Sequence, residues 1–130
     1  MKRSVFFMIS AVISLLLGVM CFVMPEKMAA GFGMTVTTLI IMMIREAGAC
    51  NLSMGFLNFY VCNDGDSKSM KAVLLFNMAY HALMLTVNIY GITNAVMPTS
   101  QIIPVFGAHL LIALGFLYYA LRVKITPQAG

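Results

Sequence analysis

Residues 72–121 read AVLLFNMAYHALMLTVNIYGITNAVMPTSQIIPVFGAHLLIALGFLYYAL, a run of 50 residues without a Lys, Arg, Asp or Glu. A helix needs about 20 apolar residues to cross roughly 30 Å of hydrocarbon. The run is therefore long enough for two membrane crossings. Residues 97–101, Met-Pro-Thr-Ser-Gln, combine a proline with small polar side chains, which is typical of the turn between two such crossings.

The rest of the chain has the same apolar character. Residues 4–25 carry no charge, and between residues 28 and 63 the only charges are the adjacent Arg45 and Glu46. The sequence therefore predicts an all-α protein, an integral membrane four-helix bundle with up-down-up-down topology. We expect one membrane domain over residues 1–130, with helices at about 5–24, 37–62, 70–95 and 103–123.

Composition excludes several classes of protein. Hydrophobic residues make up 62% of the chain and charged residues 9%, with a mean hydropathy of +0.96. Ordinary soluble domains contain about 25% charged residues, so a soluble enzyme, a nucleic-acid-binding domain and a disordered protein are excluded. The first apolar run is longer than the core of a signal peptide, and no A-x-A site follows it, so we expect a retained span.

The basic residues predict an orientation in the membrane. Four crossings leave Lys27 alone on one side and place six basic residues on the other, namely Lys2, Arg3, Lys68, Lys71, Arg122 and Lys124. Because loops rich in Lys and Arg stay in the cytoplasm, both ends of the chain are expected there. The net charge of +4 is then a signal for orientation and lipid headgroups, and no nucleic-acid partner is expected. The expected location is the inner (plasma) membrane of a bacterium.

Neither the cysteines nor the methionines predict a metal or redox site. Cys21, Cys50 and Cys62 have no CxxC or ligand spacing. The chain has 13 methionines, whose thioethers could bind Cu(I), and Met20, Met24 and Met28 are spaced at i, i+4 and i+8. The methionines are spread over every predicted helix, however, and flexible apolar packing is their commoner use. We expect no cofactor and no metal.

Each predicted helix has one face of small or polar residues at helical spacing. In chain order the four faces are Ser10, Ser14, Gly18 and Cys21; Arg45, Gly48, Asn51, Gly55 and Asn58; Asn77, His81, Met84, Asn88 and Gly91; and His109, Ala113 and Ala120. An unsatisfied polar group in hydrocarbon costs several kcal/mol. We therefore expect the four faces to meet inside the bundle.

A rise of about 1.5 Å per residue sorts the polar side chains into three levels. Asn58 and Asn77 are expected nearest the cytoplasm, and Asn51 and His81 near the middle. The outer half is expected to hold Arg45, Glu46, Asn88 and His109. The expected intramembrane polar cluster is Arg45, Glu46, Asn51, His81, Asn88 and His109.

Two interpretations of this cluster follow. In the first it is a structural clamp, in which Arg45 bonds helix carbonyls or Asn88 and His109. In the second it lines a cavity for a ligand, a lipid headgroup or a proton, with His81 and His109 as titratable groups. Glu46 points about 100° away from Arg45. Glu46 therefore bonds a different helix, or both side chains reach toward the outer interface.

No sequence motif indicates catalysis. The chain contains no Gly-rich phosphate loop, no HExxH and no GxSxG, and Glu46 has no second carboxylate at membrane depth. A zinc ion bound by His81 and His109 would lack two further ligands. We expect the protein not to be an enzyme.

Three short passages carry a resemblance to known proteins: Met24-Pro25, Arg45-Glu-Ala-Gly48 and Asn51-Leu-Ser-Met-Gly55. With His81 they resemble small bacterial four-helix membrane proteins grouped as families of unknown function, which share an R-x-x-G-x6-G pattern on helix 2. More remotely the layout is similar to DoxX-like proteins and to the four-helix scaffold protein of ergosterol biosynthesis. The resemblance implies a four-helix bundle with Arg45 turned inward, and it implies no activity.

Two functions remain open at this point. The longest polar connection, residues 64–71, is short, so little of the chain lies outside the bilayer to bind soluble partners. This favours a non-enzymatic accessory or scaffold subunit that associates laterally with other membrane subunits or with copies of itself. The alternative is a small transporter, channel or ligand-binding bundle that uses the intramembrane Arg, His and Asn cluster.

Overall fold

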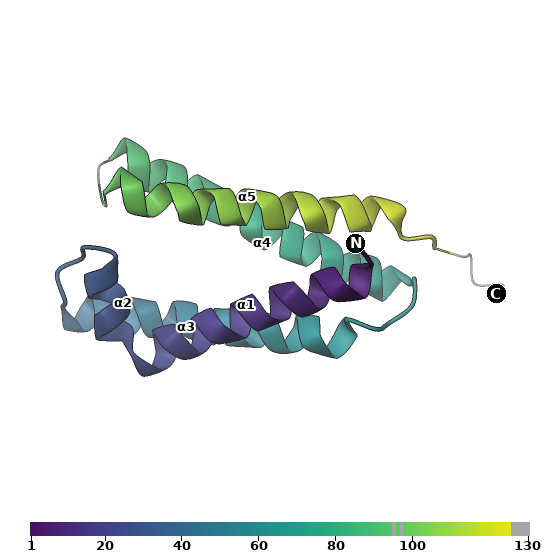
Figure 1. Ribbon diagram of the computed structural model, residues 1–130, viewed down its shortest axis with the longest axis horizontal. Helices are drawn as coiled ribbons and strands as arrows, with labels where there is room; N and C mark the ends of the chain where they lie inside the picture. Colours follow the sequence, from purple (N-terminus) through teal and green to yellow (C-terminus); the bar gives the residue numbers. More distant parts are fainter. Residues whose placement is uncertain (95, 97, 126–130) are drawn as a thin grey trace.

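The computed structural model describes residues 1–94, 96 and 98–125 of the chain, and within them it contains helices and no strands. The helices are α1 (Arg3–Val23), α2 (Pro25–Gly31), α3 (Thr38–Val61), α4 (Lys68–Thr93) and α5 (Thr99–Arg122), shown in Figure 1. The helices α1, α3, α4 and α5 are long and apolar enough to cross a membrane. The prediction of an all-α chain with four candidate spans is thus confirmed. Residues 95 and 97, in the predicted third helix and turn, lie outside the described residues.

The short helix α2 was not predicted, and a proline is the reason for it. The expectation was that Met24-Pro25 simply closes the first helix. In the structure Pro25 also occupies the first position of α2, where its fixed φ suits a helix and its missing N–H is not needed. Glu26 follows in the first turn, where a negative charge is favourable.

The start of α5 also differs from the expectation. The helix begins at Thr99 rather than near residue 103, with Pro98 as its N-cap, so residues 99–101, which were expected to be part of a turn, are helical. Pro104 consequently lies inside α5. A proline near the beginning of a helix removes one backbone hydrogen bond, which the rest of the helix tolerates here.

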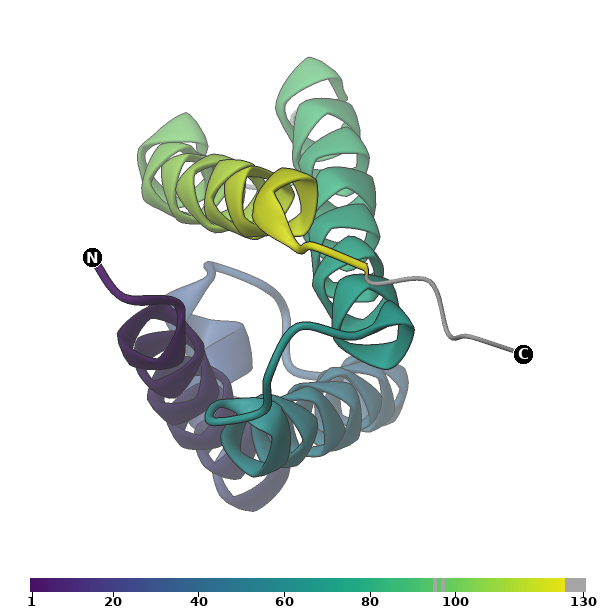
Figure 2. The ribbon, with the colours of Figure 1, turned by 90° about the vertical axis from the view of Figure 1, so that its right-hand side faces the viewer.

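The long helices form two hairpins, α1 with α3 and α4 with α5. The end that carries the N-terminus and the α3–α4 loop is here called the clamp end, and the end that carries α2 is called the α2 end. Figures 1 and 2 show that the hairpins lie close together at the clamp end and spread apart toward the α2 end. The buried apolar cluster draws on all four long helices and the segment after α5. It consists of Phe7, Val61, Cys62, Met70, Leu74, Phe116, Ala120 and Val123.

Glycine allows α1 and α3 to approach closely. A Cβ atom built on Gly18 would lie 2.8 Å from the backbone N of Leu52, and one built on Gly48 would lie 3.0 Å from the carbonyl O of Gly18. Real Cβ atoms do not come closer than about this to a neighbouring backbone. The small faces expected on the first two spans are therefore the surface along which this hairpin packs.

A pair of asparagines joins the two hairpins. Asn58 on α3 and Asn77 on α4 are both fully buried. Asn58 Nδ2 donates to Asn77 Oδ1 at 3.0 Å, and Asn77 Nδ2 donates to Asn58 Oδ1 at 2.9 Å. Asn58 also donates to Ser10 Oγ on α1 at 3.3 Å, and Asn77 donates to its own helix at the Val73 carbonyl. The expectation that Asn58 and Asn77 lie at one level is thus confirmed, and the two form a pair of matched amides.

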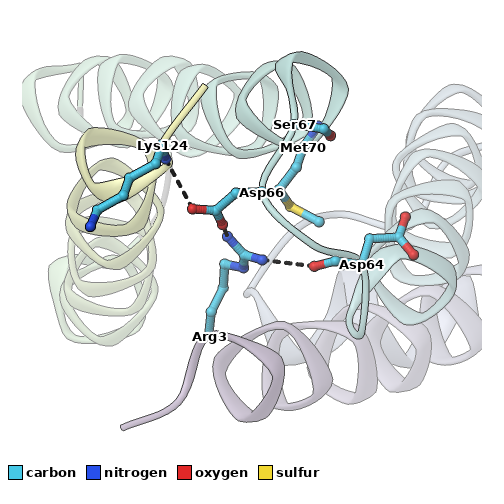
Figure 3. Close-up of polar contacts among 6 residues, drawn as sticks. All are labelled: Arg3, Asp64, Asp66, Ser67, Met70 and Lys124. Atoms are coloured by element: carbon cyan, nitrogen blue, oxygen red, sulfur yellow. Dashed lines mark hydrogen bonds and ion pairs between the residues drawn. The ribbon is translucent and has the colours of Figure 1, made fainter. Parts of the chain in front are cut away.

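Charged residues hold three segments together at the clamp end, as Figure 3 shows. The Arg3 guanidinium forms an ion pair with Asp66 and donates to the Asp64 carbonyl. The backbone N–H of Lys124 donates to the other carboxylate oxygen of Asp66 at 2.9 Å. The Lys124 N–H and the Arg3 guanidinium together hold the pKa of the Asp66 carboxyl below its usual range. Asp66 therefore links the start of α1, the α3–α4 loop and the segment after α5.

Replacing Gly18 by Ala should weaken the α1–α3 hairpin. Overpacking costs about 1–3 kcal/mol, and the gain in helix propensity of about 1 kcal/mol offsets only part of it. We expect the thermal unfolding midpoint, followed by circular dichroism in detergent micelles, to fall. Gly107→Ala is the matched control, because nothing lies within 4 Å of the added Cβ. Equal midpoints for the two variants would contradict the close approach.

The asparagine pair should show strong coupling in a double-mutant cycle. Asn77→Leu alone leaves the buried Asn58 amide without its partner, which we expect to cost about 1–2 kcal/mol of unfolding free energy. Replacing both residues by Leu should cost less than the sum of the single changes, since no buried amide then remains unpaired. The measurement is unfolding by SDS in mixed micelles, with Asn63→Leu in the exposed loop as control. Simple additivity would show that the two amides act independently.

Candidate intramembrane binding site

A cleft of about 260 Å³ lies between the two hairpins, and its lining comes from all four long helices. Most of the lining is apolar. The polar side chains in it are Ser14 from α1, Asn51 from α3, His81 from α4 and His109 from α5. The small and polar faces predicted for the four spans therefore supply the polar part of one shared space.

The two imidazoles in this cleft are hydrogen-bonded to each other. The distance between Nδ1 of His81 and Nδ1 of His109 is 2.8 Å. The His81 ring is also stacked on Phe116, with 6.1 Å between centroids and an interplanar angle of 12°. His81 is 5% exposed, and His109 is half-buried. The Nδ1–Nδ1 bond and the aromatic neighbour together fix the orientation of the His81 ring.

The bond between the two Nδ1 atoms determines what the Nε2 atoms can do. A neutral imidazole carries one proton, so one ring donates from Nδ1 and the other accepts. The donating ring keeps a lone pair on Nε2, whereas the accepting ring carries its proton on Nε2. The neutral pair thus has one Nε2 donor and one Nε2 acceptor, and the tautomer of the two rings decides which histidine has which role.

Three buried side-chain atoms lack a hydrogen-bond partner within the described part of the chain: Nε2 of His81, Nδ2 of Asn88 and Oε1 of Gln101. Of these three residues, His81 lines the cleft. Asn88 is 7% exposed and lies two turns from His81 on the same face of α4. Buried polar groups in proteins are almost always hydrogen-bonded. An unpaired Nε2 beside a cleft is therefore the feature that most needs a physical explanation.

The structure assigns the histidines to one level, whereas the sequence placed His109 further out. His81 is 13 residues from the start of α4, and His109 is 13 residues from the end of α5, so both are equally far from the clamp end. The helix bounds expected from the sequence, a start at residue 70 and an end at residue 123, placed the two histidines at different depths. In the structure α4 begins two residues earlier, at Lys68. Asn51, expected beside His81, lines the same cleft, but its Nδ2 donates to the Ala47 carbonyl of its own helix.

Arg45 and Glu46 lie outside this site. Both side chains are exposed, and within the described residues neither forms a hydrogen bond or ion pair. The expected inward turn of Arg45, with bonds to Asn88 and His109, is therefore not found. Arg45 lies at one edge of the polar arc of α3, whose buried centre is near Gly55 and Asn58. Moreover, the hairpins spread apart toward the α2 end (Figure 1), so α4 and α5 are distant there.

Phe116 and Pro104 are among the residues at the site that were not found from the sequence. Phe116, which stacks on His81, is seven residues after His109 and hence on the same face of α5. That spacing could have indicated it. Pro104 also lines the cleft. An intramembrane proline is itself a signal, because it interrupts helical hydrogen bonding where water cannot compensate.

No metal-binding group of three or more His, Cys, Asp or Glu side chains occurs among the described residues. The two Nδ1 atoms of the histidine pair face each other at hydrogen-bond distance, so they cannot also be directed at a common ion. The three cysteines are free and lie in different environments: Cys21 is half-buried, Cys50 is exposed and Cys62 is buried. The site offers hydrogen bonds and apolar surface rather than metal ligands.

Comparisons of this chain with known protein families, with curated proteins and with solved structures found no match. The resemblance noted above accordingly rests on the sequence pattern itself. Three residues of the pattern now have a physical role, since Gly48 and Gly55 pack against α1 and His81 belongs to the histidine pair. The fourth, Arg45, is exposed.

Proposed function

We propose that this protein binds a lipid-soluble molecule with a polar headgroup in the cleft between its two hairpins. The observation that carries the proposal is that His81, one of the residues that line the cleft, has a buried Nε2 without a hydrogen-bond partner among the described residues. This is the ligand-binding form of the function considered from the sequence, without Arg45. The proposal includes no catalytic step, because no carboxylate is among the described residues that line the cleft to orient either imidazole.

The hydrogen-bonding pattern indicates the headgroup. The neutral histidine pair has one Nε2–H donor and one Nε2 acceptor, assigned to the two rings by their tautomers. A carbonyl oxygen matches the donor, and a hydroxyl group matches either state. Because the desolvation penalty of an unpaired buried nitrogen is about 1–3 kcal/mol, a ligand that pairs with it gains affinity by relieving that penalty.

The size and walls of the cleft indicate the rest of the ligand. Ile13, Leu17, Val105 and Ile112 form apolar surface around the histidines. An apolar cavity of about 150 Å³ holds a benzene ring. The cleft of about 260 Å³ therefore admits a substituted ring or a headgroup with a few carbons, while a longer tail would extend into the surrounding lipid.

The orientation in the membrane is also a proposal. Up-down-up-down topology with both ends in the cytoplasm is supported by the basic residues, because Arg3, Lys68 and Lys124 are at the clamp end and Lys27 follows α1 at the other end. The inner membrane of a bacterium is supported by the resemblance alone.

A separate observation supports a second function. In this function the protein is an accessory subunit that associates laterally with other membrane proteins or with copies of itself. Arg45 is the eighth residue of α3 and is exposed, about 10 Å along the helix from its start. Glu46 beside it is exposed as well. Charges at such a position favour a protein partner over lipid, since a charged side chain in hydrocarbon costs about 2.5–3.5 kcal/mol even on the most lenient scale.

The ligand-binding proposal can be tested by nitrogen-15 NMR of the histidine rings, because His81 and His109 are the only two histidines in the chain. The probe is a short-chain benzoquinone added to the protein in detergent micelles. We expect its carbonyl oxygen to accept a hydrogen bond from the Nε2–H of His81 and so to shift the His81 Nε2 resonance. We expect para-xylene, which has a similar ring without the oxygens, to leave that resonance in place.

His81→Phe should weaken quinone binding about tenfold, the effect of one lost hydrogen bond to a buried group. Tyr90→Phe, at an exposed position on α4, is the matched control and should bind as the wild type does. Unchanged affinity in His81→Phe, or unshifted imidazole resonances in the wild type, would refute the proposal. Loss of helical circular dichroism in His81→Phe, together with unshifted wild-type resonances, would identify the pair as a structural clamp.

A further inference from the structure

One face of α3 is exposed along the whole helix and has the spacing of a helix–helix contact. Its residues alternate at intervals of three and four: Leu39, Met42, Glu46, Ala49, Ser53, Phe56 and Tyr60. All seven side chains are exposed. This α3 seam lies opposite the buried face that contains Gly48, Gly55 and Asn58. Figure 2 shows α3 near the edge of the bundle, far from α5.

The α3 seam differs from an ordinary lipid-facing surface in two ways. It contains an acidic residue, Glu46, with a basic residue, Arg45, directly beside it, and both are unpaired within the described chain. At its centre stand Ala49 and Ser53, four residues apart. Small residues at this spacing allow two membrane helices to approach closely. Lipid explains the exposure of Leu39 or Phe56, but it does not explain an exposed charged pair within a span.

We propose that the α3 seam is a homodimer interface, in which Arg45 of each copy pairs with Glu46 of the other. The charges decide in favour of a second copy as the occupant. A two-fold axis brings the same surface of both subunits together, so a patch that contains one positive and one negative residue is complementary to itself. The four charges that meet there sum to zero.

The spacing of the α3 seam gives the contact its register. Copies in one membrane have the same orientation, so the two α3 helices run parallel, and an alternation of three and four residues is that of a parallel coiled coil. In this packing a side chain at the position of Glu46 enters a hole formed by four residues of the facing helix. Arg45 is one of those four, because it directly precedes the equivalent position. Each carboxylate thus meets a guanidinium without any shift along the axis.

There is also room beside the α3 seam for a second helix. A hollow of about 400 Å³ lies between α3 and α4, and Ala49 and Ser53 belong both to its lining and to the α3 seam. The rest of the hollow is largely apolar, with Phe76 and Tyr80 from α4. Side chains of a partner helix that lies on the small residues can fill this hollow. The contact is then centred on Ala49 and Ser53, with the ion pairs toward the α2 end.

The decisive experiment is charge reversal followed by native mass measurement of the full chain in mild detergent. We expect the wild type at twice 14.2 kDa. Arg45→Glu leaves four acidic groups at the contact and Glu46→Arg leaves four basic ones, so each should weaken dimerisation about tenfold or more. The double variant R45E/E46R restores opposite charges and should restore the dimer.

Cysteine crosslinking locates the contact independently. In a background with Cys21, Cys50 and Cys62 replaced by Ala, Ala49→Cys should form an intersubunit disulfide on mild oxidation. Leu111→Cys is the matched control, because Leu111 is exposed on α5 at nearly the same distance from the α2 end. We expect no disulfide there.

The proposed dimer would be overturned if the wild type is a monomer or if a different protein co-purifies in place of the second copy. It would also be overturned if the charge reversals leave the mass unchanged or if both cysteine positions crosslink equally. The experiment is also separate from the test of the cleft. Arg45→Glu should leave the quinone-dependent shift of the His81 resonance unchanged, and His81→Phe should leave the mass at that of the dimer. Either proposal can therefore fail without the other.

Discussion

The structure depends on the requirement that polar side chains inside a membrane find partners within the protein. Asn58 and Asn77 meet it most completely, since each amide donates to the other and the pair joins α1 and α3 to α4. Without water to replace these bonds, the two hairpins must come together at this level of the chain. The apolar cluster around Phe7, Leu74 and Phe116 then packs at the same end of the molecule.

The two hairpins do not stay in contact along their whole length. From the asparagine pair and the Asp66 ion pair at the clamp end they spread toward the α2 end, as Figure 1 shows. The histidine pair stands where the separation leaves a cleft that all four spans line. Both histidines thus line a space of about 260 Å³ between the hairpins. Arg45 and Glu46 are exposed and form no hydrogen bond or ion pair with the described residues.

Much of this arrangement could be predicted from the residues. Helical spacing correctly identified the face of α4 that contains Asn77, His81 and Asn88, all buried in the structure. Depth along the helices correctly paired Asn58 with Asn77. The same estimate of depth placed His81 and His109 at different levels, however. The predicted start of α4 was two residues too late, and two residues correspond to about 3 Å of depth. The short helix after Pro25 was missed because a proline that ends one helix can equally begin the next.

The sequence by itself determined the class of protein, the four apolar spans and the small or polar face of each. These properties depend on composition and on periodicity within one helix. Only the tertiary structure decided that His81 bonds His109, that a cleft lies beside them and that Arg45 points away from both. The physical reason is that periodicity defines a face to within a broad arc, whereas contact depends on how each helix is rotated and how far the hairpins diverge. Those two quantities result from packing among all the spans, in particular from Gly18 against Leu52 and from the Asn58–Asn77 pair.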